Sequence, residues 1–128
     1  MKSKIKKYSK NSIQLASRSL LNGSTIILPT DTVYGIAALA GNKKAVEKIF
    51  KIKKRPKSMP LIIFVKSIKD AAKLAKFSPL DITLANELWP GPLTLILKKK
   101  KSVIYNGDKR LSKIGIRIPK NKVVLDLL

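Results

Sequence analysis

Arg117 is the residue in this sequence best suited to hold an anion. Only four of the 28 basic residues are arginines, at positions 18, 55, 110 and 117. A guanidinium binds carboxylate or phosphate through two parallel hydrogen bonds, which a lysine ammonium matches poorly. Arg117 lies inside the apolar run 114–118 (IGIRI). A buried arginine needs an anionic partner, so this run predicts an anion site, although strand alternation equally permits the side chain to face solvent.

A second concentration of basic groups occurs in residues 53–60 (KKRPKSMP). Lys53, Arg55 and Lys57 can converge on a polyphosphate, and the two prolines restrict the backbone that carries them. A basic loop that is simply solvated is the alternative for this segment.

Residues 29–35 (PTDTVYG) form a third polar loop, directly after an apolar run. Its hydroxyls and backbone amides lie where an open sheet usually places its ligands. The alternative is a simple turn in which Asp31 bonds its own backbone.

The sequence contains neither cysteine nor histidine. This composition excludes disulfides, thiolate zinc sites, cysteine nucleophiles and Ser-His-Asp triads within the chain. The lack of cysteine also fits a cytoplasmic location.

The formal net charge of +21 predicts an anionic partner, such as nucleic acid, a nucleotide or an anionic metabolite. Part of this charge has a simpler explanation, because abundant lysine, isoleucine and asparagine together are typical of AT-rich coding sequence. With 45% hydrophobic residues the chain is expected to fold as one domain, residues 1–128. No apolar run reaches the ~18 residues of a membrane span, and no secretory signal is evident, so no membrane association is expected.

Helices and strands are expected to alternate in the first half of the chain. A helix should begin at a cap on Asn11 or Ser12, run to about Leu21 and stop at Gly23. A buried strand is expected over 25–28, a helix over 43–53 capped by Asn42, and a second strand over 61–65.

The second half has the same mixed character. A helix is expected around 70–76, and Ser78-Pro79 should start another that runs to about Leu88. Strands over 94–98 and 113–118 should form an antiparallel pair joined through a turn at 106–108. Asn121 should cap a last helix with a buried face of Val123, Val124, Leu127 and Leu128. The expected fold class is therefore α/β or α+β with a mixed sheet.

Four segments together resemble the YrdC/Sua5 family, in the family's order and with compatible spacing. They are 29–37 (PTDTVYGIA), 53–62 (KKRP, then PLI), 88–94 (LWPGPLT) and 115–119 (GIRIP), and the resemblance covers about residues 10–128. Members are threonylcarbamoyl-AMP synthases and close relatives. The resemblance implies a twisted mixed sheet with flanking helices and a basic concave face.

The same resemblance implies an activity. L-threonine, bicarbonate and ATP would be joined into threonylcarbamoyl-AMP with release of pyrophosphate, and Mg²⁺ would accompany the ATP. Threonylcarbamoyl-transferase proteins downstream would then use this product to make threonylcarbamoyladenosine in tRNA.

The resemblance also implies roles for individual residues. Threonine would contact Thr32, Tyr34 and Arg117. The nucleotide would contact Lys53, Arg55, Met59 and Lys113, and no side chain is implied as a catalytic residue or metal ligand.

Two departures from the family pattern bear on activity. Phe64 stands where many members have histidine. The family's Ser-x-Asn element would follow the position where this sequence stops, so a domain truncated at its C-terminus, inactive without the remainder, is expected. The alternatives are a YrdC-like module that binds double-stranded RNA or tRNA without catalysis, and an inactive remnant.

Overall fold

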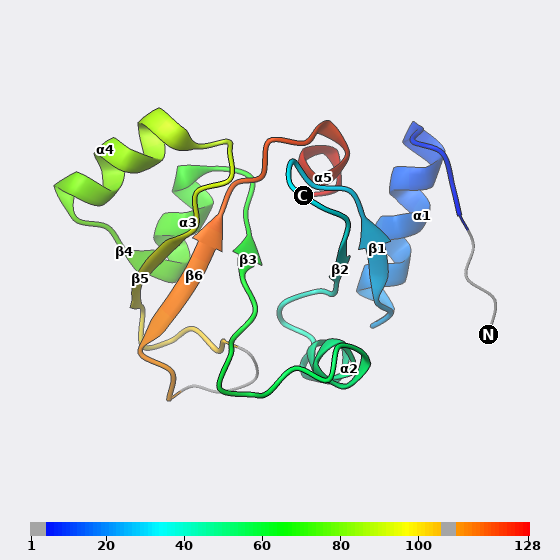
Figure 1. Ribbon diagram of the computed structural model, residues 1–128, viewed down its shortest axis with the longest axis horizontal. Coiled ribbons are helices and arrows are strands. Elements are labelled where there is room, and N and C mark those ends of the chain that lie inside the picture. The colour runs from blue at the N-terminus through cyan, green and yellow to red at the C-terminus, as the bar shows by residue number, and fades with distance from the viewer. Residues whose placement is uncertain (1–4, 106–109) are drawn as a thin grey trace.

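The computed structural model describes residues 5–105 and 110–128, and its strands form two sheets (Figure 1). In the smaller sheet β1 (Ile26–Leu28) pairs antiparallel with β2 (Gly35–Ala37). The larger sheet has four strands in the order β3-β6-β5-β4, and only the β3–β6 pair is parallel. Its members are β3 (Ile63–Phe64), β4 (Ala75–Lys76), β5 (Leu95–Lys99) and β6 (Lys113–Arg117). The mixed sheet and the predicted antiparallel pairing of β5 with β6 are confirmed.

In the described part of the chain, five helices flank these sheets. In Figure 1, α3 and α4 lie beside the four-stranded sheet, and α2 lies at the end of the β1–β2 hairpin where the chain leaves β2. Helix α1 contacts both β1 and α5, elements far apart in the sequence. The helices are α1 (Lys10–Leu21), α2 (Lys43–Ile52), α3 (Ile68–Leu74), α4 (Pro79–Leu88) and α5 (Lys122–Leu127).

The predicted helix caps are correct in three cases and wrong in one. Asn42, Ser78 and Asn121 each accept hydrogen bonds from the first turn of their helix. Helix α1, however, is capped by Ser9 rather than Asn11 or Ser12. Ser9 and Ser12 bond each other's backbone N–H in a capping box, so Ser12 is the third residue of the helix, not its cap.

Several expected boundaries also differ from the structure. The helix expected to reach residue 76 ends at Leu74, because Ala75–Lys76 pairs with β5 as a short edge strand. Sheet pairing here overrides helix-forming residues. The strand expected over 61–65 is limited to Ile63–Phe64, and the short strand β2 was not predicted at all. The predicted turn at 106–108 lies outside the described residues.

Two burial predictions need correction. In β1 only Leu28 is buried, and Ile27 is 73% exposed, because β1 lies in a two-stranded hairpin and not inside a larger sheet. In α5 only Val124 is buried, and Leu128 is 45% exposed. By contrast, the predicted buried face of α2, namely Val46, Ile49 and Phe50, is confirmed.

The main hydrophobic core lies between the four-stranded sheet and helices α3 and α4. Strand β6 contributes Ile114 and Ile116, which are almost completely buried. Because side chains alternate along a strand, the opposite side of β6 carries Lys113, Gly115 and Arg117. We call this second side the open face of β6.

Candidate functional site

The open face of β6 carries two residues that the sequence assigns to different substrates. Lys113 begins the strand and Arg117 ends it, about 13 Å apart at roughly 3.3 Å per residue. Gly115 lies between them and pairs with Ile96 of β5, whose side chain is 65% exposed. A Cβ at Gly115 would lie 3.3 Å from Ile96 Cδ1, a tight contact. Because glycine has no side chain, none projects from this face of the strand between Lys113 and Arg117.

Arg117 is buried, with only 7% of its surface exposed. Its Nε donates a hydrogen bond to the carbonyl of Gly91 at 2.9 Å, and its Nη2 forms an ion pair with Asp31. The ring of Phe64 lies 5.7 Å from the guanidinium carbon, a cation–π contact. The alternative in which Arg117 faces solvent is therefore wrong, and part of the expected anionic partner is supplied by the protein itself.

The segment 88–94 is folded around Arg117. Gly91 donates its N–H to the carbonyl of Ile118 at 2.9 Å while its own carbonyl accepts from Arg117. A Cβ at Gly91 would lie 2.4 Å from the carbonyl oxygen of Leu88, which no real contact tolerates. The glycine of this segment thus permits the close approach that fixes the guanidinium.

The loop 29–35 is a turn built on Thr30. Its Oγ1 accepts hydrogen bonds from the backbone N–H groups of Thr32 (3.2 Å) and Val33 (3.1 Å). The simple-turn interpretation was thus correct about the kind of structure but wrong about the residue, because Asp31 is paired with Arg117. Thr30 leaves Asp31 available for this ion pair.

The two other residues predicted to contact threonine lie on the same loop. Thr32 is exposed, and its hydroxyl lies 3.0 Å from that of Thr30. Tyr34 is 77% exposed. Thr32 directly follows Asp31, the residue that pairs with Arg117. Contact with threonine stays a prediction for Thr32, Tyr34 and Arg117.

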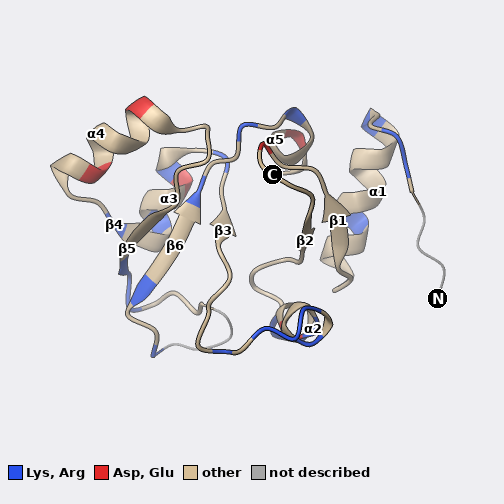
Figure 2. Cartoon of the chain, in the orientation of Figure 1, with Lys and Arg blue, Asp and Glu red and all other residues tan. Residues whose placement is uncertain are grey.

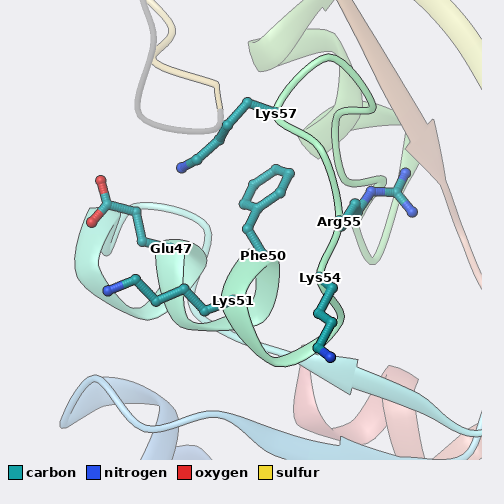
Figure 3. A pocket seen from close by; sticks show the side chains of 6 residues that line it. All are labelled: Glu47, Phe50, Lys51, Lys54, Arg55 and Lys57. Atoms are coloured by element: carbon teal, nitrogen blue, oxygen red, sulfur yellow. The ribbon is translucent and has the colours of Figure 1, made fainter.

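Arg55 organises the loop 53–60. Its Nε donates to the carbonyl of Met59 at 2.6 Å and its Nη2 to the carbonyl of Pro60 at 2.9 Å. Lys54 has a left-handed backbone with φ of 50°, and Figure 3 shows its side chain directed away from that of Arg55. Lys53 is the exposed C-terminal cap of α2. The loop therefore brings Arg55 and Met59 together, and among the described residues no hydrogen bond joins the Lys53 side chain to either of them.

A shallow hollow of about 340 Å³ lies against the outer side of this loop (Figure 3). The Lys57 ammonium lies 4.6 Å from the centre of the Phe50 ring, at one wall of the hollow. The wall includes Lys54 but not Lys53, which is the reverse of what the family pattern implies. The lining residues are Glu47, Phe50, Lys51, Lys54, Arg55 and Lys57.

Tyr105 connects this loop with the open face of β6, and sequence reasoning missed it. The ring is 3% exposed, and its hydroxyl donates to the carbonyl of Leu61. Burial raises the pKa of Tyr105 above its usual value of 10.0, and this effect is opposed by a backbone hydrogen bond at Gly115 and by the charge of Arg55. A lone tyrosine after Val103 and Ile104 carries no sequence signal for such a role.

The predicted site residues therefore fall into two groups. Arg117 and the loop 29–35 meet at one end of β6, and Lys113 lies at its other end, on the side where the chain passes from α2 to β3 (Figure 1). Figure 2 shows basic residues at both ends of β6 and along the segment that follows α2. Among the described residues no contact joins Lys113 to Lys53 or Arg55.

Two further features concern ions and membranes. Within residues 5–105 and 110–128, no group of three or more acidic side chains could hold a metal ion. In the same part of the chain, no helix combines the length and apolar character needed to cross a membrane.

Comparison with known proteins places this fold and site in a family. Residues 18–128 match the family model Sua5_yciO_yrdC, described as "Telomere recombination". The match covers most of the chain, so the protein belongs to the Sua5/YciO/YrdC family.

Individual relatives agree with this assignment. A putative threonylcarbamoyl-AMP synthase of Methanocaldococcus jannaschii is 39% identical over 92% of this chain and 56% of its own length. The threonylcarbamoyl-AMP synthase of Pyrococcus abyssi is 38% identical over 91% of this chain, which is 34% of that protein. This chain thus spans between a third and about half of these two relatives.

Solved structures show the same fold. The Pyrococcus abyssi Sua5 structure complexed with L-threonine has a TM-score of 0.85 and 36% identity, covering 95% of this chain and 36% of that one. The Escherichia coli YciO structure has a TM-score of 0.82 at 25% identity, covering 95% of this chain and 60% of that one. The expected YrdC-like sheet with flanking helices is confirmed.

Proposed function

We propose that this chain is the part of a threonylcarbamoyl-AMP synthase that holds L-threonine and part of ATP. The observation that carries the proposal is the buried Arg117, fixed beside the loop 29–35 on the open face of β6. It is supported by the relatives named threonylcarbamoyl-AMP synthase and by the similar Sua5 structure that contains L-threonine.

The reaction suits a site that has no histidine or cysteine. The amine nitrogen of threonine attacks the carbon of bicarbonate, which forms the N–C bond of a carbamate and releases water. A carbamate oxygen then attacks the α-phosphorus of ATP, and pyrophosphate leaves. Both steps depend on alignment of reactants and on neutralisation of negative charge, which arginine and lysine supply.

The two groups of residues divide this work. Arg117 would donate hydrogen bonds to the threonine carboxylate, with Thr32 and Tyr34 beside it. Lys53, Arg55, Met59 and Lys113 would hold the nucleotide toward the other end of the open face. Mg²⁺ would bind together with ATP, coordinated by its phosphates, because the described residues include no cluster of acidic side chains that could hold the ion. The ion would offset the negative charge of the phosphates.

Binding of the two substrates to the chain tests this function. We expect isothermal titration calorimetry to show L-threonine binding, together with ATP binding that is weak and falls as salt is raised, since exposed cations are screened. ATP binding that is tight and independent of salt would contradict the charge-based nucleotide site. If L-threonine does not bind at all, the proposed function is wrong.

The complete reaction is tested in a longer chain. The 128 residues, fused to the C-terminal remainder of the Methanocaldococcus jannaschii relative, should release pyrophosphate only when threonine, bicarbonate and ATP are all present. Release without threonine would mean simple ATP hydrolysis. Bicarbonate, downstream threonylcarbamoyl-transferases, a one-domain organisation and a cytoplasmic location are likewise proposals for this chain.

RNA binding is a second candidate function, favoured by the lysines on and after α2. These side chains are exposed, and few acidic residues lie among them (Figure 2). A row of lysines can follow a phosphate backbone by charge alone. The residues are Lys43, Lys44, Lys48, Lys51, Lys54 and Lys57.

A charge-reversal pair tests this candidate. Lys44→Glu with Lys51→Glu should abolish retention of double-stranded RNA on a filter and leave L-threonine affinity unchanged. If RNA retention persists in this variant, the α2 surface is not the binding site.

A further inference from the structure

Arg117 and Asp31 form an ion pair at the end of β6. Both side chains are nearly buried, with 8% and 12% of their surfaces exposed. The pair joins the end of β6 to the loop 29–35, and therefore links the two sheets. We infer that Asp31 makes this site specific for a zwitterion, binding the ammonium group of the amino acid whose carboxylate Arg117 binds.

The first argument is the charge of the site. With Asp31 beside it, Arg117 is already neutralised, and both groups lie largely out of water. A carboxylate entering alone would leave one negative charge in excess in a poorly solvated place, which is unfavourable. A zwitterion adds one charge of each sign, so the loaded site stays neutral.

The second argument is the set of atoms that remain available. Arg117 uses Nε for Gly91 and Nη2 for Asp31 Oδ1. Within the part of the chain that the structure describes, neither Arg117 Nη1 nor Asp31 Oδ2 has a hydrogen-bond partner. The ion pair thus keeps N–H donors on Arg117 and an acceptor oxygen on Asp31, which matches the carboxylate and ammonium of a single α-amino acid.

The third argument is the rigidity of both partners. The guanidinium is fixed by the Gly91 carbonyl and by the face of Phe64. Asp31 is positioned by the turn on Thr30, whose Oγ1 holds two backbone N–H groups of the same loop. The pair therefore exists before the ligand arrives, as recognition of a small zwitterion requires.

This inference rests on the proposed function and is tested with three probes and three variants. The probes are L-threonine, 3-hydroxybutyrate, which lacks the ammonium group, and L-threoninol, which lacks the carboxylate. The variants are Asp31→Asn, Asp31→Glu and the control Asp70→Asn. The control makes the same chemical change on the solvent side of α3, where, among the described residues, the Asp70 side chain pairs with Lys73 alone, at 3.4 Å. Affinities for the intact 128-residue chain are measured by calorimetry.

The expected result is a change in selectivity. The unchanged chain should bind L-threonine at least tenfold more tightly than either analogue. Asp31→Asn should weaken L-threonine binding at least tenfold while 3-hydroxybutyrate binds as well as before or better, because the excess negative charge is gone. Asp31→Glu should restore part of the preference, and Asp70→Asn should change nothing.

Three other outcomes overturn the inference. If Asp31→Asn weakens L-threonine and 3-hydroxybutyrate equally, Asp31 only holds Arg117 in place. If Asp31→Asn strengthens L-threonine binding, Asp31 competes with the substrate carboxylate. If Asp31→Asn fails to fold, the test is the ratio of the affinities of the unchanged chain for L-threonine and 3-hydroxybutyrate. Equal affinities rule the inference out. Failure of the proposed function is distinct, because then the unchanged chain does not bind L-threonine.

Discussion

Arg55 donates a hydrogen bond from Nε to the carbonyl oxygen of Met59 at 2.6 Å, closing the loop to which both residues belong. The same guanidinium also holds the carbonyl of Pro60 at 2.9 Å. A residue proposed to meet phosphate is thus also the residue that shapes its own loop. Lys54, its neighbour in sequence, has the same charge and no such bonds among the described residues.

Arg55→Ala should therefore reduce ATP affinity more than Lys54→Ala. The arginine change removes the guanidinium proposed to meet a phosphate, together with the two bonds that shape its loop. We expect a loss of about tenfold or more, since one hydrogen bond to a charged group contributes roughly 1.5–3 kcal/mol. Lys54→Ala removes an equal charge and should cost about twofold. Calorimetric titration with ATP compares the two variants. Equal losses would mean that the loop acts only as a cloud of positive charge.

Arg117→Lys should reduce threonine affinity about tenfold or more and affect ATP affinity much less. Lysine keeps the charge but lacks the planar donor set that reaches Gly91, Asp31 and a carboxylate together. Initial rates of pyrophosphate release in the extended chain, measured against threonine and against ATP, separate the two effects. If Arg117→Lys leaves the dependence of the rate on threonine unchanged but weakens retention of RNA on a filter, RNA binding becomes the better-supported function.

Gly91→Ala should lower the free energy of unfolding by roughly 2 kcal/mol or more, because the new Cβ would lie 2.4 Å from the backbone oxygen of Leu88. The matched control is Gly41→Ala, where a Cβ meets nothing within 4 Å, and it should stay within about 0.5 kcal/mol of the unchanged chain. Urea unfolding measures both. Two similar values would show that the segment around Gly91 adapts easily.

Tyr105 should make the chain less stable in alkali. Burial raises its pKa in the folded state, so above pH 10 the unfolded chain loses this proton first. The contribution of Tyr105 is present in full below the unfolded pKa and declines as the pH rises from about 10 toward the folded pKa.

The comparison with Tyr105→Phe isolates this effect. Phenylalanine loses the hydrogen bond to Leu61, at a cost of about 1 kcal/mol near neutral pH, but it cannot ionise. The stability difference between the two proteins should therefore shrink above pH 10. A difference that is constant with pH would show that the ring ionises as readily when folded as when unfolded.

Local sequence was enough to predict several elements of this protein. Asn42, Ser78 and Asn121 cap helices because their side chains satisfy the backbone N–H groups of the adjacent turn, an interaction that needs no distant partner. The buried face of α2 follows from helical periodicity in the same way. The burial of Arg117 was open from sequence, because strand alternation alone does not say which side of β6 is covered.

Only the tertiary structure decided what surrounds Arg117. Asp31 is 86 positions away in sequence and Gly91 is 26, and neither contact follows from a periodicity or a capping rule. The edge strand at Ala75–Lys76 and the position of Tyr105 over Leu61 likewise depend on partners elsewhere in the chain. Sequence determined which local conformations were accessible, whereas the surroundings of Arg117 required distant segments to pack together, since its charge is balanced by Asp31 only where those segments meet.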